Sequence, residues 1–231
     1  MTIEVDRSAY VIAFAGIVSA VFTAAIMSLH AATSPRVQRN EKLFRERALV
    51  EVFDLSKGGA LSDEQVLAIY SRQVRPGATV TDPETGTSFK LFEAVDADGK
   101  VIGYALPIWG VGFWARIDGY LAVTPDLQRV LGVTFLDHSE TPGLGGRITE
   151  PAWRRTFHGL DVSEPAAGGE YIYIGGGDTG PARGRRVDAI TGATGTCNAL
   201  MRFLNKRLAE FRRAAEAAGM IKEQNRQPVP V

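Results

Sequence analysis

The sequence has few of the residues that bind metals or cross-link chains. It contains one cysteine, Cys197, so we expect neither an internal disulfide nor a zinc or iron–sulfur site built from several cysteines. The cysteine content leaves the redox compartment open. The three histidines, His30, His138 and His158, are far apart and lack the spacing of metal ligands, so we expect no metal site.

The sequence also lacks an excess of charge of either sign. Its 26 Lys and Arg residues are balanced by 26 Asp and Glu residues. A protein that binds nucleic acid would carry a basic face with exposed aromatic side chains for stacking. No such pattern is present, and we expect no nucleic-acid partner.

One long hydrophobic run is present near the N-terminus. The residues from Ala9 to Leu29 carry no charge, and a helix of this length spans about 30 Å, the thickness of the hydrocarbon core of a bilayer. A cleaved signal peptide is the alternative, but its apolar core is shorter and its leading segment is basic. Here Glu4 and Asp6 outnumber Arg7. We therefore predict a retained transmembrane helix.

The charges that flank this run predict an orientation. Only Arg7 precedes the run, whereas a group of basic residues follows it: Arg36, Arg39, Lys42, Arg45 and Arg47. By the positive-inside rule, this asymmetry places the rest of the chain in the cytoplasm.

The whole chain is long enough for one well-buried core behind the anchor. We expect a short N-terminal flank at residues 1–8, the transmembrane anchor at residues 9–29, and a helical stalk and linker at residues 30–60. One globular domain follows at residues 61–220. A flexible tail, residues 221–231, ends the chain.

The residue pattern predicts both helices and strands. Pro35 is expected to begin the stalk helix, Ser62 and Gln65 have the form of a capping box that opens a second helix, and Pro76-Gly77 ends that helix. An amphipathic helix begins near Cys197. Strand-like runs lie at residues 89–95, 101–106, 115–123, 130–137 and 171–174. Because hairpin-length connections favour antiparallel pairing, the fold class is α+β: an antiparallel sheet with packed helices, preceded by one N-terminal transmembrane helix.

A run of small residues and threonines precedes the last helix, with the sequence Asp-Ala-Ile-Thr-Gly-Ala-Thr-Gly-Thr at residues 188–196. Its backbone can approach a bulky group closely. The free N–H groups and the positive dipole at the start of the helix would hold a phosphate near Thr194. Alternatively, Thr194 or Thr196 is only an N-cap and Gly192 only a turn residue.

Two motifs in this order resemble those of one family. Residues 188–194 resemble the Asp-x-x-[Ser/Thr]-Gly-Ala-Thr motif of flavoproteins to which a flavin transferase attaches FMN. Residues 140–145 resemble the Glu-Thr-Pro-Gly-Leu-Gly loop of the same proteins. Over nearly its whole length the chain is similar to the FMN-binding subunits of two membrane electron-transfer complexes, the sodium-translocating NADH:quinone reductase and the Rnf-type complex. The choice between these two kinds of subunit stays open.

The resemblance implies that residues 61–220 are an FMN-binding domain and that FMN is linked through its phosphate to the last threonine of the first motif. The implied cofactor-binding residues are Asp188, Thr191, Gly192, Ala193 and Thr194, together with Glu140, Thr141, Gly143, Leu144 and Gly145. Thr141 and Leu144 are implied to contact the flavin. Asp188 either orients a hydroxyl during attachment or is a loop acid that accepts nearby backbone N–H groups.

A third segment, residues 107–114, contains two tryptophans and two glycines. It resembles the Gly-x-Gly-[Leu/Phe]-Trp segment of the FMN-binding subunits of the NADH:quinone reductase. It is expected either to cover an isoalloxazine ring or meet another subunit, or else to be an aromatic plug in the core. Trp153 is expected to pack in the core.

The resemblance implies an electron-relay subunit with no catalytic residue of its own. Its implied partners are other membrane subunits and, during maturation, a flavin transferase. The resemblance also implies that the flavin domain is periplasmic, whereas the flanking charges predict a cytoplasmic domain. We expect the periplasmic location, because long domains cross membranes largely regardless of such charges. Two alternatives stay open: a stand-alone membrane-anchored flavoprotein reductase, and a structural or sensory module that binds no cofactor.

Overall fold

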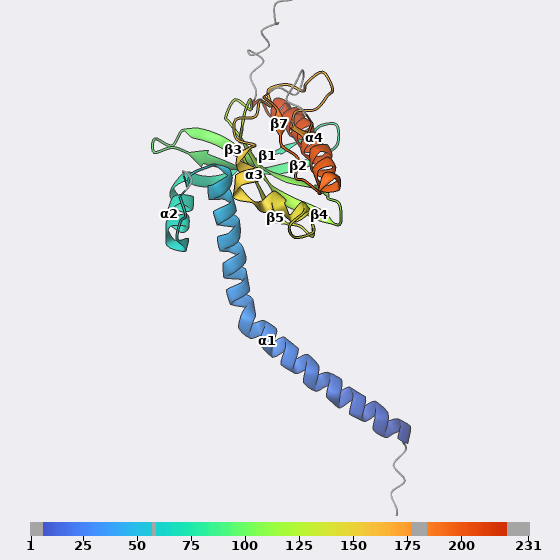
Figure 1. Cartoon of the computed structure of the whole chain (residues 1–231). Helices are drawn as coiled ribbons and strands as arrows, with labels where there is room; N and C mark the ends of the chain where they lie inside the picture. The colour runs from blue at the N-terminus through green and yellow to red at the C-terminus, as the bar shows by residue number, and fades with distance from the viewer. Residues whose placement is uncertain (1–6, 57–58, 177–183, 221–231) are drawn as a thin grey trace, which may run out of the picture. The chain divides into compact units, whose positions relative to one another are not determined.

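The computed structural model describes residues 7–56, 59–176 and 184–220 (Figure 1). The chain divides into two units, Met1–Phe44 and Arg45–Val231. The tail predicted at residues 221–231 and most of the flank predicted at residues 1–8 lie outside the described residues.

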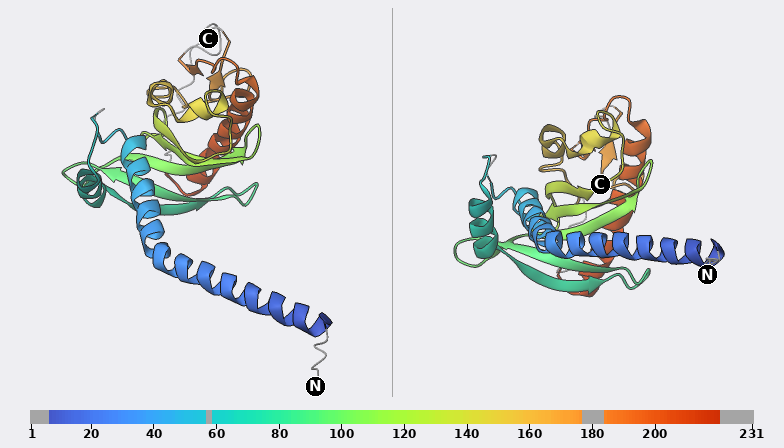
Figure 2. Two further views of the ribbon diagram at one scale, coloured as in Figure 1. Left: turned by 60° about the horizontal axis from the view of Figure 1, so that its bottom comes forward. Right: turned by 90° about the horizontal axis from the view of Figure 1, so that it is seen from below.

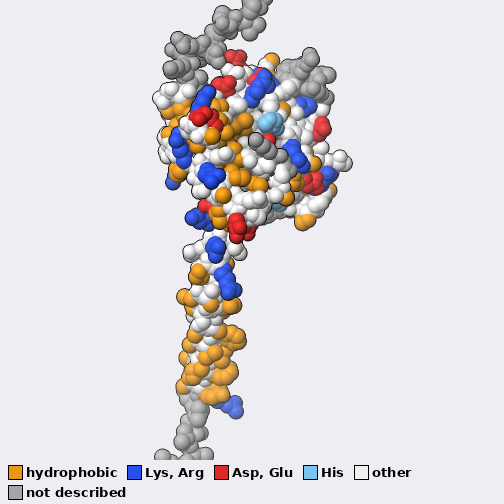
Figure 3. All heavy atoms as spheres, turned by 90° about the vertical axis from the view of Figure 1, so that its left-hand side faces the viewer, with side chains coloured by type: hydrophobic (Ala, Val, Ile, Leu, Met, Phe, Trp, Pro, Cys, Tyr) orange, Lys and Arg blue, Asp and Glu red, His pale blue; other side chains and the backbone are white. Residues whose placement is uncertain are grey.

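Helix α1 (Arg7–Val52) contains the apolar run that was predicted as an anchor. Its most apolar stretch of 18 residues has a mean hydropathy of 2.2 and contains no buried residue. Hydrophobic side chains cover this part of the helix in Figure 3. Length and composition therefore make α1 able to cross a membrane. The separate stalk helix predicted to begin at Pro35 is wrong, because Pro35 lies inside α1. Pro35 has no backbone N–H and so removes one hydrogen bond from the helix, but the turns on both sides of it remain helical.

A five-stranded antiparallel sheet forms the centre of the second unit (Figure 2). In the chain the sheet comes after helix α2 (Asp63–Gln73). The first turn of α2 has the predicted capping box between Ser62 and Gln65. The strands lie in chain order in the sheet: β1 (Val74–Thr81), β2 (Ser88–Val95), β3 (Val101–Val111), β4 (Arg116–Val123) and β5 (Val130–Asp137). The predicted α+β fold with an antiparallel sheet is confirmed.

Strand β1 was not predicted. Pro76-Gly77 was expected to end a helix, but α2 ends at Gln73 and both residues lie within β1. An edge strand tolerates proline because one side of its backbone has no strand partner. The register of β1 shifts between Pro76 and Thr79, which absorbs the irregular backbone.

The two faces of the sheet bury different side chains. Helix α4 (Thr194–Ala217) lies across one face of the sheet in both views of Figure 2. Its buried apolar side includes Leu200, Leu204 and Phe211. The other face presents small residues and receives the last turn of α1. Its buried cluster consists of Leu49, Val52, Phe53, Val74, Ala94, Ala105 and Ala122.

The described residues between β5 and α4, 138–176 and 184–193, contain only short helices and strands. They include a short 3₁₀ helix, η1 (Gly145–Thr149), and a short helix, α3 (Pro151–Arg155). Two short strands, β6 (Tyr173–Ile174) and β7 (Arg186–Val187), pair in parallel as a separate sheet.

The strand predicted at residues 171–174 is shorter than expected because helix α4 binds half of it. The side-chain oxygen of Asn205 accepts the backbone N–H groups of Tyr171 and Ile172 at 2.6 and 2.9 Å. Its amide nitrogen donates to the Ile172 carbonyl at 2.8 Å. One polar side chain thus replaces a strand partner.

An ion pair joins α4 to the turn between β1 and β2. Asp82 is fully buried, and the guanidinium of Arg213 donates to both of its carboxylate oxygens at 3.0 and 2.7 Å. The hydroxyl of Thr85 donates to the same carboxylate at 2.7 Å. Arg213 also lies 3.2 Å from the exposed Glu84. The hydrogen bonds from Arg213 hold the pKa of Asp82 well below its usual range.

We expect Asp82→Asn to destabilise the full chain by about 1–3 kcal/mol at pH 7, because it leaves Arg213 without its buried partner. The pKa of Asp82 is lower in the folded state, so the stabilisation by its carboxylate is complete above the unfolded-state pKa of about 4 and is lost as the pH falls further. Urea unfolding in detergent micelles at several pH values measures both effects. Glu84→Gln is the matched control, and an equal effect of both variants would contradict the assignment.

Candidate functional site

Three segments that are far apart in the sequence converge beside the start of α4. They are the turn between β3 and β4, the loop that follows β5, and the first turn of α4 itself. The two predicted motifs, residues 140–145 and 188–194, are thereby brought together. The turn between β3 and β4 lies within the predicted aromatic segment.

The side chain of Glu140 connects all three segments. It is 4% exposed. One carboxylate oxygen, Oε1, accepts the backbone N–H groups of Phe113 and Trp114 at 2.8 and 3.2 Å. The other, Oε2, accepts the hydroxyl of Thr196 at 2.6 Å. The carboxylate is buried, and these donors replace the water it would otherwise bind.

Glycines make the close approach of the three segments possible. A Cβ atom on Gly112 would lie 2.4 Å from Oε1 of Glu140, and one on Gly145 would lie 2.4 Å from the hydroxyl of Thr196. A Cβ atom on Gly195 would lie 2.4 Å from the ring of Phe113. Real Cβ atoms do not approach so closely, so any side chain at these positions would force the segments apart.

Thr194 is the first residue of α4 and is exposed. The helix was predicted to begin near Cys197, three residues too late. The alternative in which Thr194 or Thr196 is an N-cap is wrong, because Ala193 is the N-cap and no side chain caps this helix end. Thr196 is buried and donates its hydroxyl to Glu140 instead. Gly192 has a φ of +78°, which supports its predicted role in a turn.

The predicted aromatic segment has two parts with different environments. Residues up to Val111 belong to β3, where the ring of Trp109 is partly buried, 5.8 Å from the ring of Phe89 and beneath the guanidinium of Arg207. Phe113 and Trp114 lie in the turn and are 58% and 67% exposed. Core packing therefore describes Trp109, whereas Phe113 and Trp114 are available to a ligand or another protein.

Exposed apolar side chains lie against the glycines near Thr194. The indole N–H of Trp114 donates to the hydroxyl oxygen of Thr141 at 3.1 Å, which joins the turn to the loop after β5. Leu144 is 43% exposed and lies against Gly192, where a Cβ atom would be 2.9 Å from its methyl group. Gly143, with a φ of +75°, forms the turn between Thr141 and Leu144.

The remaining predicted residues lie on the approach to α4. Asp188 and Thr191 are exposed, whereas Ala193 is buried. The backbone carbonyl of Asp188 accepts the indole N–H of Trp153 at 2.8 Å, and Trp153 is buried as predicted. Cys197 is 2% exposed, and its sulfur accepts the backbone N–H of Ile190 at 3.4 Å. Buried side chains thus fix the segment that leads to Thr194.

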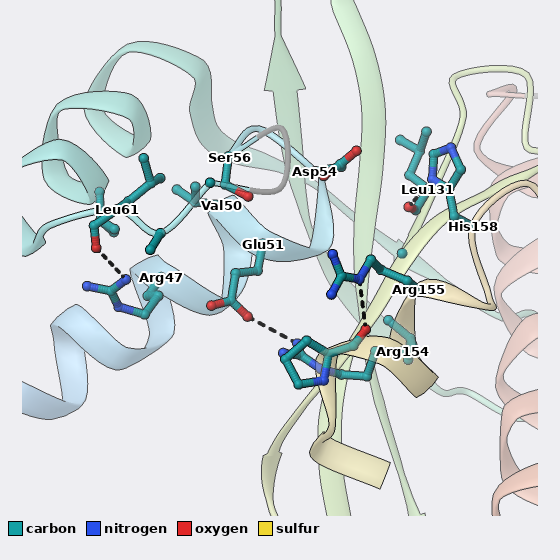
Figure 4. Close-up of a pocket in the computed structure, with 16 residues that line it drawn as sticks. Arg47, Val50, Glu51, Asp54, Ser56, Leu61, Leu131, Arg154, Arg155 and His158 are labelled. Carbon is teal, nitrogen blue, oxygen red and sulfur yellow. Dashed lines mark hydrogen bonds and ion pairs between the residues drawn. The ribbon is translucent and has the colours of Figure 1, made fainter. Parts of the chain in front are cut away.

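The structure also contains a cavity of about 660 Å³ that involves none of the predicted site residues (Figure 4). Helices α1 and α3 and strand β5 contribute to its lining. Two of its arginines have partners within the protein: Arg47 pairs with Asp63 at 2.6 Å, and Arg154 pairs with Glu51 at 3.1 Å. The lining residues are Arg47, Val50, Glu51, Asp54, Ser56, Gly59, Ala60, Leu61, Val66, Leu131, Gly132, Val133, Pro151, Arg154, Arg155 and His158.

Sequence reasoning missed the roles of Gly112, Gly195 and Thr196. Thr196 was considered only as a possible N-cap. The small residues on both sides of Thr194 were a usable signal, because they indicate that another segment packs closely against the backbone there. The partner segment itself could not be identified from spacing along the chain.

Residues 112–209 match the family model of the FMN-binding domain. This match begins at Gly112 in the β3–β4 turn and ends within α4, so it contains all three segments of the site. This part of the chain thus matches an FMN-binding domain.

The chain is also similar to NqrC, a subunit of the Na(+)-translocating NADH-quinone reductase. It is 38% identical over 191 residues to the NqrC subunit of Chlamydia muridarum, a match that covers 76% of this chain and 58% of the relative. It is 27% identical to the NqrC subunit of Pseudomonas aeruginosa, with 82% of this chain and 85% of the relative covered. Together, the family match and these relatives support an FMN-binding subunit of the NqrC type.

Two solved structures share the fold. The crystal structure of NqrC from Shewanella oneidensis has a TM-score of 0.61 and 22% identity, and covers 75% of this chain and 95% of its own. The crystal structure of the same subunit from Parabacteroides distasonis has a TM-score of 0.62 and 19% identity, with 77% and 94% covered. The predicted recognition of the family and the predicted fold are confirmed.

We expect Gly145→Ala to destabilise the domain by about 1–3 kcal/mol, because the added methyl group would push Thr196 away from Glu140. Gly146→Ala is the matched control, since the nearest atom to its added methyl group is a backbone oxygen at 3.2 Å. Thermal unfolding of the full chain in detergent micelles measures the difference. Equal stability of the two variants would show that the site tolerates separation of these segments.

Proposed function

We propose that this protein is a membrane-anchored electron-transfer subunit that carries FMN in a phosphoester bond to Thr194. In this proposal it relays electrons within an ion-translocating NADH-quinone reductase. The observation that carries the proposal is the position of Thr194: it is the exposed first residue of α4, between Gly192, against which Leu144 lies, and Gly195, against which Phe113 lies.

The start of α4 suits a phosphate. The backbone N–H groups of its first residues have no acceptor within the helix, and no side chain caps them. No acidic residue of α4 lies in its first turn, so no side chain of the helix itself neutralises the positive end of the helix dipole. The Glu140 carboxylate lies beside this turn, where it accepts the Thr196 hydroxyl. A phosphate ester at Thr194 would therefore be stabilised in place.

The surrounding side chains suit an isoalloxazine ring. Thr141 uses its hydroxyl oxygen to accept the indole N–H of Trp114, which leaves its own O–H proton free to donate to a flavin carbonyl or ring nitrogen. Leu144 and the exposed faces of Phe113 and Trp114 offer apolar contact to the ring. FMN would supply reversible electron storage at this position, and the protein would tune its potential through hydrogen bonds and burial.

Attachment requires a flavin transferase and an FAD donor. The new bond joins Oγ of Thr194 to the flavin phosphorus, the bond between the two phosphates of FAD breaks, and AMP leaves. The hydroxyl proton passes to a base on the transferase. Exposure of Thr194 allows a second protein to reach the hydroxyl, and Asp188, also exposed, is available to that protein on the same approach.

The partners in this proposal are the other membrane subunits of the complex, and ion translocation belongs to the assembly. The relatives that support it are named as subunits of a Na(+)-translocating NADH-quinone reductase. The chain spans only 58% of the first of them, so the activity of the whole complex enters as part of the proposal. We further propose a single-pass location in the bacterial inner membrane, with the flavin domain in the periplasm.

We expect full-length protein coexpressed with a flavin transferase to carry an adduct of the mass of FMN on the peptide that contains Thr194. Thr194→Val should abolish the adduct, whereas Thr79→Val, which removes an exposed hydroxyl on β1, should retain it. Intact and peptide mass spectrometry measures both. An unmodified wild type, with the transferase shown to act on another substrate, would instead favour a module that binds no covalent cofactor.

We expect a phosphatase reporter that folds only in the periplasm to be active when fused after Val231. The same fusion without residues 9–29 should be inactive, because it lacks the apolar segment that directs the chain to the membrane. Reporter activity in intact cells measures the orientation. If only a cytoplasmic reporter is active at this position, the flanking basic residues determine the orientation.

A further inference from the structure

The Glu140 carboxylate is buried and accepts three hydrogen bonds from the protein, which leaves it little capacity for direct contact with a cofactor. It is 4% exposed, and its Oε1 accepts two backbone N–H groups. Its Oε2 accepts the Thr196 hydroxyl and is also crowded by Gly145, where a Cβ atom would lie 2.8 Å away. The residue therefore acts on the site through the segments that it binds.

Those segments carry the Trp114 indole and the Thr194 hydroxyl, and the distance between these two groups matters for a flavin. Oε1 binds the backbone of Trp114, whose indole is exposed beside Thr141. Oε2 binds Thr196, which is two residues after Thr194 in the first turn of α4. One rigid carboxylate thus lies between the aromatic turn and the residue proposed to bear the phosphate.

We propose that Glu140 is a positioning residue that fixes the aromatic turn relative to the Thr194 hydroxyl, and that Thr196 is the group through which it holds α4. This inference rests on the proposed function, because it assigns Glu140 a role in FMN attachment. It also makes a claim that is independent of flavin: removal of the Thr196 hydroxyl must loosen a turn more than 80 residues earlier in the chain, since both are bound to the same side chain.

The test uses the full chain in detergent with Thr196→Val, which removes the hydroxyl with little change of volume. In protein made without a transferase, we expect hydrogen exchange of the Phe113 and Trp114 backbone amides to become about tenfold faster, because the carboxylate that protects them loses its second anchor. With a transferase, we expect the initial rate of FMN attachment to Thr194 to fall about tenfold.

Two variants serve as matched controls. Thr196→Ser keeps the hydroxyl and should restore both rates to within about twofold of wild type. Thr79→Val removes an exposed hydroxyl on β1 that is not bound to Glu140 and should change neither. Should Thr196→Val fail to accumulate, Thr196→Ala removes the same hydroxyl without adding a methyl group in its place.

The outcomes separate the possible failures. Unchanged exchange in Thr196→Val would overturn the proposed coupling through Glu140. Faster exchange with an unchanged rate of attachment would overturn its role in positioning the acceptor. A wild type that takes up no FMN from a transferase active on another substrate would overturn the proposed function, and the exchange measurement alone would then decide whether Glu140 couples the turn to α4.

Discussion

The site depends on the hydrogen bonding of one buried carboxylate. A charged group away from water is tolerated only when donors replace its hydration, and Glu140 has donors from two separate segments. The three glycines around it follow from the same requirement, because the donors reach the carboxylate only if no side chain intervenes. The loop after β5, the β3–β4 turn and the start of α4 are therefore constrained as one unit, although few apolar contacts join them.

Helix α4 supports this unit with polar side chains as well as its apolar face. Asn205 binds the backbone beside β6, and Arg213 binds the buried Asp82. Arg212 donates to the carbonyls of Leu127 and Val162 at 2.7 and 2.8 Å. Because these bonds all come from one helix, irregular segments of the domain are held at fixed positions relative to the first residue of α4.

The fold was predictable where local chemistry decides it. The capping box at Ser62, the alternating strands and the amphipathic α4 were predicted because each depends on neighbouring residues. The predictions failed where a distant partner decides. Strand β1 accepts Pro76 because it lies at the edge of the sheet, and Asn205 occupies backbone groups that the predicted strand at residues 171–174 would have used. Within the site, both motifs were predictable from the sequence, but the bond from Thr196 to Glu140 joins residues 56 positions apart and leaves no pattern in the sequence.

The burial of Cys197 has a practical consequence for studying the protein. It is the only cysteine in the chain, and its sulfur lies under the start of α4, 2% exposed. Thiol-specific probes therefore find almost no target on the folded wild type. A cysteine placed at a chosen surface position would be the one accessible thiol, so spin labels, fluorophores or cross-linkers could be attached to a single known site without first removing a native residue.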